Sequence, residues 1–153
     1  MSARALAVIL AGSIAATACG GHTATKQNVI ARANAICFTA LQAVRSLSPP
    51  TTGTGALASL SAYLHKVVPI VAREAADTRA LPRPSPDRAV LNRYVAAVSA
   101  AETEYRALAS AAARGDHAAV AQALSALHGN AATALATEYG LSQCAASAGT
   151  GVS

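Results

Sequence analysis

Apolar residues spaced at intervals of three and four constrain the fold of this chain more than any other feature. In the first such segment they fall on one face of a helix, at Ile30, Ala33, Ile36, Cys37, Ala40, Leu41, Val44 and Leu47. Three later segments show the same spacing, and no useful length of chain alternates with the period of two that strands require. Because alanine, the strongest helix former, is abundant throughout, we predict an all-α fold.

Capping residues and turns divide the periodic part of the chain into four predicted helices. Thr25, Ser85 and Asp116 are placed to cap helix starts, because their side-chain oxygens accept hydrogen bonds from the first free backbone N–H groups. Gly115 and Gly140 are placed to end helices. The predicted helices cover residues 26–47, 56–80, 86–114 and 117–139.

Two interruptions are expected inside these helices. Pro69 lacks a backbone N–H group, so we predict a kink or a break in the second helix just before it. Gly129 and Asn130 interrupt the fourth helix, where glycine costs about 1 kcal/mol against alanine. The short connections favour an up-down-up-down four-helix bundle over residues 26–144, followed by a disordered tail at 145–153.

The first residues resemble an export signal ahead of this domain. Arg4 supplies a positive start, the run from Ala5 to Ala18 supplies a short apolar core, and Ala16-Thr17-Ala18 supplies a small-residue cleavage site. The run is shorter than the roughly 20 apolar residues that span a bilayer. Residues 1–18 are therefore predicted to be a cleaved signal peptide and not a membrane helix.

Cys19 follows the cleavage site directly, and Ala16-Thr17-Ala18-Cys19-Gly20 resembles the lipobox of bacterial lipoproteins. In that family the cysteine thiol receives a diacylglycerol before cleavage. The resemblance implies a protein anchored outside the cytoplasm by lipid on Cys19, with residues 19–25 as a flexible tether. The alternative is an ordinary secreted protein that begins at Cys19, because Ala16-Thr17-Ala18 also fits plain signal cleavage.

The lipobox resemblance also bears on the other two cysteines. If lipid occupies Cys19, then Cys37 and Cys144 remain as a pair, and outside the cytoplasm they are expected to form a disulfide. A bridge that closes a loop of roughly 100 residues stabilises a fold by about 4–5 kcal/mol on chain-entropy grounds. The alternative, a metal site made from two cysteines, lacks the close spacing of such ligands.

The basic charge of the chain indicates no specific partner. The formal net charge is +5, and it falls to +4 if Arg4 leaves with the signal peptide. The arginines are scattered along the chain, whereas nucleic-acid-binding proteins gather basic residues on one face or in a tail. We therefore expect no nucleic-acid partner and at most a weak attraction to an anionic membrane surface.

Familiar catalytic and metal-binding patterns are missing from the sequence. There is no Glu-x-x-His for a di-iron bundle, no Gly-x-Ser-x-Gly and no phosphate-binding loop. Glu102, Glu104 and Glu138 are interpreted as solvated charges, and Glu102 is spaced to pair with an arginine four residues later. Tyr94 and Tyr105 are expected at the edge of the core, with their hydroxyl groups near water.

Three function hypotheses follow. The first is a binding, accessory or scaffold role at the cell envelope, without catalysis or a cofactor, with the membrane and an envelope protein as partners. The second is a carrier or sensor that holds a small apolar ligand between the helices, motivated by the small alanine side chains and by Pro69. A remote alternative is a haem or metal held between His65 and His128, which flank the predicted apolar stripes.

Overall fold

The computed structural model describes residues 24–147, and every regular element in that range is helical. The helices are α1 (Lys26–Arg45), α2 (Ala56–Arg79), the 3-10 helix η1 (Ser85–Asp87), α3 (Arg88–Ala113), α4 (His117–His128), α5 (Ala132–Tyr139) and α6 (Ser142–Ser147). The predicted all-α fold class is therefore confirmed for this part of the chain. The predicted signal peptide, Cys19 and residues 148–153 lie outside the described residues.

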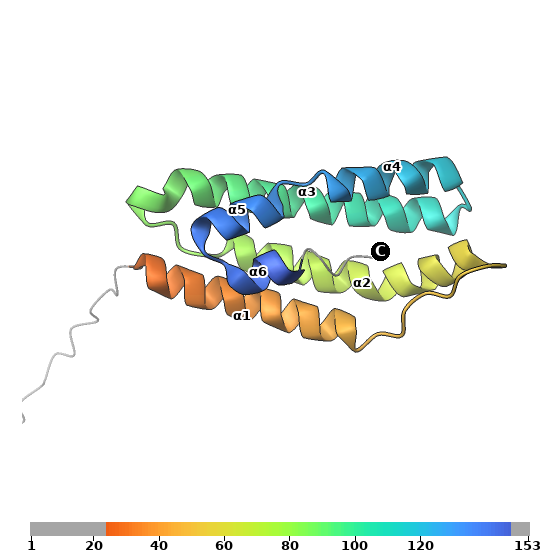
Figure 1. Cartoon of the computed structure of the whole chain (residues 1–153), viewed down its shortest axis with the longest axis horizontal. Coiled ribbons are helices and arrows are strands. Elements are labelled where there is room, and N and C mark those ends of the chain that lie inside the picture. The colour runs from red at the N-terminus through yellow and green to blue at the C-terminus, as the bar shows by residue number, and fades with distance from the viewer. Residues whose placement is uncertain (1–23, 148–153) are drawn as a thin grey trace, which may run out of the picture.

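Three long helices form the body of the molecule. α1, α2 and α3 run side by side in alternating directions, and α4 and α5 follow one another back along α3 (Figure 1). α2 packs most extensively against α3, while α1 packs against α2 and against the short α6. α1 and α4 make little or no direct contact with each other. The α1–α4 side of the molecule is therefore not closed by direct helix packing.

Two of the predicted helix caps are confirmed. The Thr25 hydroxyl accepts a hydrogen bond from the Asn28 N–H at 3.3 Å and starts α1. The Asp116 carboxylate accepts one from the Ala119 N–H at 3.0 Å and starts α4. Each side chain satisfies a backbone donor that has no partner within its helix.

The prediction that Ser85 caps the third helix is wrong. Ser85 opens η1, and α3 begins at Arg88 without a side-chain cap. The Asp87 N–H is bonded to the Pro84 carbonyl oxygen at 3.0 Å. That bond occupies one of the donors that a Ser85 hydroxyl would need, and it tightens the first turn into a 3-10 geometry.

Both predicted glycine helix ends are confirmed. Gly115 and Gly140 adopt positive φ angles of 70° and 90°, which glycine reaches without the steric cost of a Cβ atom. After Gly140 the Leu141 N–H returns to the Ala136 carbonyl oxygen at 2.7 Å, and the Leu141 side chain is fully buried. Turn chemistry and apolar burial therefore act together to reverse the chain after α5.

Of the two outcomes predicted at Pro69, a break in the helix is wrong, because α2 is a single helix from Ala56 to Arg79. Pro69 cannot donate to the His65 carbonyl oxygen four residues earlier. Pro69 and His65 are both exposed, so water can reach this side of the helix. The helix thus continues with the loss of one hydrogen bond, and the alternative of a kink there stays a prediction.

The interruption of the fourth predicted helix is real, and Asn130 shapes it. The Asn130 Nδ2 donates to the Ala97 carbonyl oxygen of α3 at 2.9 Å, and its Oδ1 accepts from the Ala132 N–H at 2.8 Å. Gly129 keeps a right-handed helical backbone, with φ at −80°. The side chain of Asn130, more than the flexibility of Gly129, therefore separates α4 from α5.

The residues after Leu141 form a helix, which the sequence did not predict. α6 includes Ala145 and Ser147, so the predicted disorder of 145–153 is wrong for its first three residues. The Gln143 N–H donates to the Asn34 Oδ1 of α1 at 3.0 Å. α6 packs against both α1 and α5, and these contacts order a segment whose small side chains do not by themselves specify structure.

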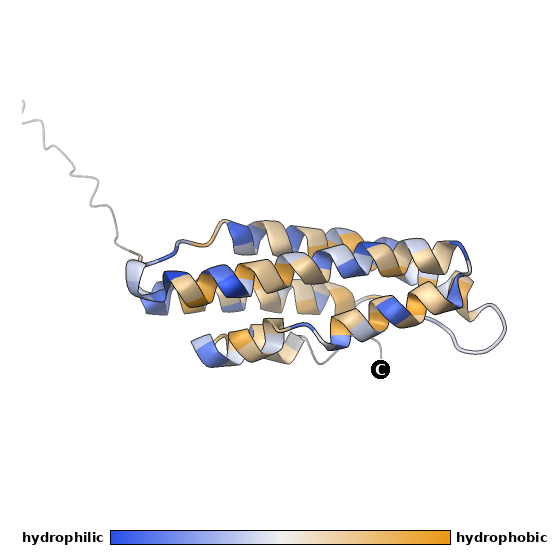
Figure 2. Ribbon diagram, turned by 90° about the horizontal axis from the view of Figure 1, so that it is seen from above, coloured by the Kyte–Doolittle hydropathy of each residue, from blue (hydrophilic) through white to orange (hydrophobic). Residues whose placement is uncertain are grey.

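The buried core falls into two clusters. The first lies where α1, α5, α6, the end of α2 and the first half of α3 meet, and the second lies between α4, the first half of α2 and the second half of α3. Figure 2 shows apolar and polar residues distributed along the same helices, as expected for helices that bury one face. The functional interest of the fold lies between the two clusters.

Candidate functional site

A pocket with a volume of about 230 Å³ separates the two core clusters. Three buried residues that belong to neither cluster, Ala40, Leu41 and Val67, form part of its wall. All six α-helices contribute lining residues. His128 and Thr133, on either side of the α4–α5 break, line the pocket and are also exposed, so the pocket opens to solvent there. We call this feature the central pocket.

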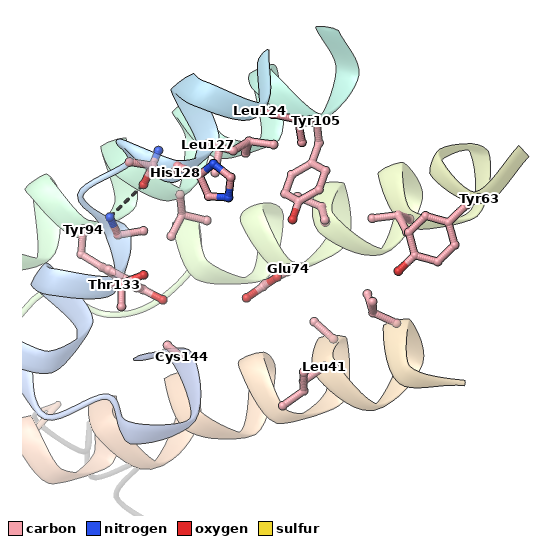
Figure 3. A pocket seen from close by; sticks show the side chains of 18 residues that line it. Leu41, Tyr63, Glu74, Tyr94, Tyr105, Leu124, Leu127, His128, Thr133 and Cys144 are labelled. Carbon is pink, nitrogen blue, oxygen red and sulfur yellow. Dashed lines mark hydrogen bonds between the residues drawn. The ribbon is translucent and has the colours of Figure 1, made fainter. Parts of the chain in front are cut away.

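Glu74 is the only carboxylate in the described part of the chain that lines the central pocket. It belongs to the inward face of α2, because it follows Val67 and Val71 at helical spacing. Figure 3 shows its side chain directed from α2 into the space between the helices. Within residues 24–147 it makes no hydrogen bond and no ion pair. Burial raises the pKa of Glu74 to about 7, because the charged form is poorly solvated there.

The other charges near Glu74 along α2 are paired elsewhere. Its neighbour Arg73 faces solvent, where it lies 3.8 Å from the Asp77 carboxylate. Arg79, one turn further on, lies 3.1 Å from Glu102 on α3. No arginine or lysine of residues 24–147 lines the central pocket. Glu74 therefore has no lysine or arginine in this part of the chain to offset its charge there.

Three tyrosines surround the same space. Tyr63 comes from α2, and Tyr94 and Tyr105 come from α3. In Figure 3 the hydroxyl of Tyr105 points toward Glu74. Burial raises the pKa values of Tyr94 and Tyr105, and the negative charge of Glu74 raises both further. The raised pKa values keep the Tyr94 and Tyr105 phenols neutral at ordinary pH. All three hydroxyl groups can donate and accept hydrogen bonds on an otherwise apolar wall.

The expectation that the Tyr94 hydroxyl lies near water is wrong. Tyr94 is 2% exposed, and its Oη atom lies 3.6 Å from the Cys37 Sγ. Cys37 and Cys144 form a disulfide-distance pair, and Cys144 also lines the pocket. The predicted pair of cysteines is thus brought together at one end of the central pocket.

The two histidines of the haem hypothesis are not brought together in one pocket. His128 lines the central pocket, whereas His65 lies in a separate surface depression beside Pro69 and Arg106. Among residues 24–147 no cluster of three histidine, cysteine or carboxylate side chains is arranged to hold a metal ion. Cys19 lies outside the described residues.

Two of the acidic residues predicted to be solvated charges form ion pairs. Glu102 lies 2.8 Å from Arg106, as its spacing predicts, and it also pairs with Arg79. Those two arginines lower the pKa of the Glu102 carboxyl, mainly through the Arg106 hydrogen bond. Glu138 pairs with Arg93 at 3.1 Å on the exposed surface. These pairs lie outside the central pocket.

Sequence reasoning missed Glu74 altogether. A signal was present, because the helical spacing from Val67 through Val71 continues to residue 74, where a carboxylate interrupts an apolar stripe. An acidic residue at a core position is unusual unless it is paired or functional. The pocket around it could not be read from the sequence, because it depends on how the helices are spaced.

Comparisons with protein-family models, curated proteins and solved structures found no match to this chain. Within residues 24–147, no helix combines the length and the apolar character that crossing a membrane requires. The class of protein is therefore described by its architecture and its site: a small all-α domain with one carboxylate in a solvent-connected apolar pocket.

Proposed function

We propose that this protein binds a small molecule in the central pocket and is held outside the cytoplasm by lipid on Cys19. The observation that carries the binding role is the pocket itself, which contains Glu74 without a protein partner. A structural protein gains nothing in stability from an unpaired carboxylate in an apolar pocket, since its charged form is disfavoured there by several kcal/mol. Such a group is more readily explained as part of a binding site.

The size of the pocket supports a small ligand. A cavity of about 150 Å³ lined by apolar side chains holds one benzene molecule, and pockets for drug-sized ligands begin at about 300 Å³. The central pocket, at about 230 Å³, lies between these sizes. It suits a ligand of one ring with a short chain, or an aliphatic group of similar volume.

A scaffold role with an envelope protein as partner is the other proposal. Such a partner would be expected to cover an extended apolar surface patch. Phe38, with 50% of its surface exposed, is the large hydrophobic residue that stands out on the described part of the chain. One exposed phenylalanine is a weaker argument than a pocket with an unpaired carboxylate, so we place ligand binding first.

The overall architecture belongs to the same proposal. We propose that the domain is an up-down-up-down four-helix bundle whose fourth helix is broken into α4 and α5. The break places Asn130, Ala132 and Thr133 around the pocket. In this arrangement the irregular segment would provide access to the ligand site.

The lipid anchor can be tested by intact mass. The protein extracted from native membranes is expected to begin at Cys19 and to carry the mass of a diacylglycerol modification. The Cys19→Ala variant is expected to appear in the soluble extracytoplasmic fraction without that mass. An unmodified wild-type protein that begins at Cys19 would support ordinary secretion and overturn the anchor.

Ligand binding can be tested with a pair of alanine variants on α3. Ala101 lines the central pocket and its neighbour Ala100 is exposed, so Ala101→Leu fills the pocket while Ala100→Leu does not. Native mass spectrometry of the purified wild type is expected to show a bound small molecule. The complex should persist in Ala100→Leu and disappear in Ala101→Leu. A wild-type protein without any bound molecule, and with no binding of small apolar probes, would overturn the proposal.

A further inference from the structure

We propose that the ligand of the central pocket is an organic amine, whose cationic nitrogen pairs with the Glu74 carboxylate and whose apolar body lies against the tyrosines and aliphatic side chains. This inference rests on the proposed binding function and adds the charge and chemical class of the ligand. It is carried by the position of Glu74 and by the composition of the wall around it.

The charge balance of the pocket favours a cation. Among the residues that the structure describes, Glu74 is the one acidic side chain in the wall, and no lysine or arginine lines it. This is notable in a chain with 12 basic and 7 acidic residues, where a positive partner for a carboxylate is readily found on the surface. Glu102 and Glu138 have such partners at 2.8 Å and 3.1 Å. An ammonium group supplied by the ligand would give Glu74 the partner that residues 24–147 do not supply.

The tyrosines favour a cation for a second reason. The whole sequence contains four tyrosines, one phenylalanine and no tryptophan, yet Tyr63, Tyr94 and Tyr105 all line this pocket. The face of an aromatic ring attracts a nearby cation through its quadrupole, and the attraction grows when water is removed. Neutral phenol oxygens also accept hydrogen bonds from ammonium N–H groups. A carboxylate in a pocket that is also lined by three phenol rings, two of which interact electrostatically with it, is thus a chemically coherent amine site.

The remaining wall determines the body of the ligand. Aliphatic side chains from four helices supply it, including Leu41, Val71, Val98 and Leu124. The other polar groups of the wall are the tyrosine hydroxyl groups and the side chains beside the α4–α5 break, among them His128 and Thr133. The volume of about 230 Å³ leaves room for roughly one ring and a two-carbon chain, judged against the benzene-sized cavity of about 150 Å³. An arylalkylamine therefore matches both the charge and the size of the site.

Matched probes separate the charge of the ligand from its shape. 2-Phenylethylamine and propylbenzene have nearly the same size, and they differ in an ammonium group in place of a methyl group. Binding would be measured by NMR titration at pH 8 to the full chain carrying Cys19→Ala, so that no attached lipid absorbs the probes. We expect the amine to bind at least about tenfold more tightly than propylbenzene.

The Glu74→Gln variant provides the main test. Glutamine keeps the shape of the side chain and removes its negative charge. We expect amine affinity to fall at least about tenfold, while propylbenzene affinity changes by less than about twofold. The control is Glu138→Gln, a carboxylate removed from the exposed surface away from the pocket, which should leave both affinities unchanged. Circular dichroism would verify that both variants remain helical.

The pH dependence gives an independent readout of the same contact. Because the pKa of Glu74 is about 7, its ionised fraction is roughly tenfold higher at pH 8 than at pH 6, and amine affinity should rise by about that factor. The other titratable groups that line the pocket are Tyr63, Tyr94, Tyr105 and His128. The raised pKa values of Tyr94 and Tyr105 keep these two phenols from ionising in this range. The rise should therefore persist in His128→Gln and vanish in Glu74→Gln.

The outcomes distinguish this inference from the proposed function. If propylbenzene binds as tightly as the amine and Glu74→Gln changes neither affinity, the pocket binds ligands but the proposal that the ligand is a cation is wrong. If neither probe binds, the binding function fails together with the cation. If amine affinity falls in Glu138→Gln as much as in Glu74→Gln, general surface charge explains the preference and the assignment to Glu74 is overturned.

Discussion

At the scale of single residues, Glu74 is the least expected feature of the molecule. A carboxylate at a core position of an amphipathic helix is normally replaced by an apolar residue or paired with an arginine. Here the nearest arginine in sequence, Arg73, pairs with Asp77 on the surface. Burial without such a partner raises the pKa of Glu74 to about 7, so about half of these side chains are neutral at pH 7.

The raised pKa makes a prediction about stability. Glu74 binds its proton more tightly in the folded chain, with a pKa of about 7, than in the unfolded chain, where its ordinary value of 4.5 applies. Its contribution to folding is therefore complete below pH 4.5 and is lost as the pH rises through 7. Glu74→Gln removes this loss. The free energy of unfolding of the variant, measured against that of the wild type, should therefore be up to about 3 kcal/mol more favourable above pH 7 than it is at pH 4.5.

Urea unfolding at pH 4.5 and pH 8 measures this difference directly. Glu138→Gln serves as the surface control, because Glu138 and its partner Arg93 are both more than half exposed, and such pairs contribute little. The change in its free energy of unfolding between pH 4.5 and pH 8 should equal the wild-type change within about 0.5 kcal/mol. If Glu74→Gln shows the same change as the wild type between these pH values, Glu74 is well solvated, which would contradict its place in an apolar wall.

At the scale of helices, the segment after α3 depends on one helix break and one turn, each set by a particular residue. The break between α4 and α5 is held by Asn130, whose side chain bonds Ala97 on α3 and the first N–H of α5. The turn after α5 is held by Gly140, which adopts a positive φ. The two glycines near these turns, Gly129 and Gly140, therefore have different roles despite similar surroundings in sequence.

Substitution of these two glycines by alanine should have opposite effects. A Cβ atom on Gly140 would meet Ile30 at an ordinary 3.7 Å, so the cost comes from its φ of +90° and should be about 1–2 kcal/mol. Gly129 has a right-handed helical backbone, and the nearest atom to a Cβ there would be the Ser125 carbonyl oxygen at 3.5 Å, an ordinary contact. Gly129→Ala should therefore be neutral or stabilise by up to about 1 kcal/mol. Thermal unfolding of the two variants compares them; equal destabilisation would contradict the assigned backbone roles.

At the scale of the whole molecule, α1 is attached through α2 and α6. It makes little or no contact with α4, so the short α6 and the Cys37–Cys144 contact close the molecule on this side. Cys144 also lines the central pocket. The connection that secures α1 thus forms part of the site, and loosening it should change both stability and binding.

Removal of this connection should be costly. If the pair is oxidised, the bridge spans 107 positions in sequence, and its reduction should lower the free energy of unfolding by about 4 kcal/mol. The urea midpoint before and after reduction measures this loss, and intact mass should rise by about 2 Da. The Cys37→Ala/Cys144→Ala variant should match the reduced protein. An unchanged mass and midpoint on reduction would show that the two cysteines are not bonded.

Much of the fold could be predicted from the sequence, because helix formation and helix ends depend on neighbouring residues. The spacing of apolar residues indicated the inward faces, and Thr25, Asp116, Gly115 and Gly140 marked helix ends through local hydrogen bonds and backbone angles. The errors have two causes. At Ser85 a competing local bond, from the Asp87 N–H to the Pro84 carbonyl oxygen, replaces the predicted cap. At α6 distant contacts decide, because packing on α1 and α5 orders a segment with little local preference.

The sequence by itself determined that this chain is helical, where most of its helices begin and end, and which two cysteines could meet. Only the tertiary structure decided that the core of the described residues divides in two, that a pocket of about 230 Å³ lies between the halves, and that Glu74 lines it with no lysine or arginine from residues 24–147. The reason is physical: helix formation is governed by interactions over three or four residues, whereas the volume and charge of a pocket depend on the separation of helices far apart in the chain.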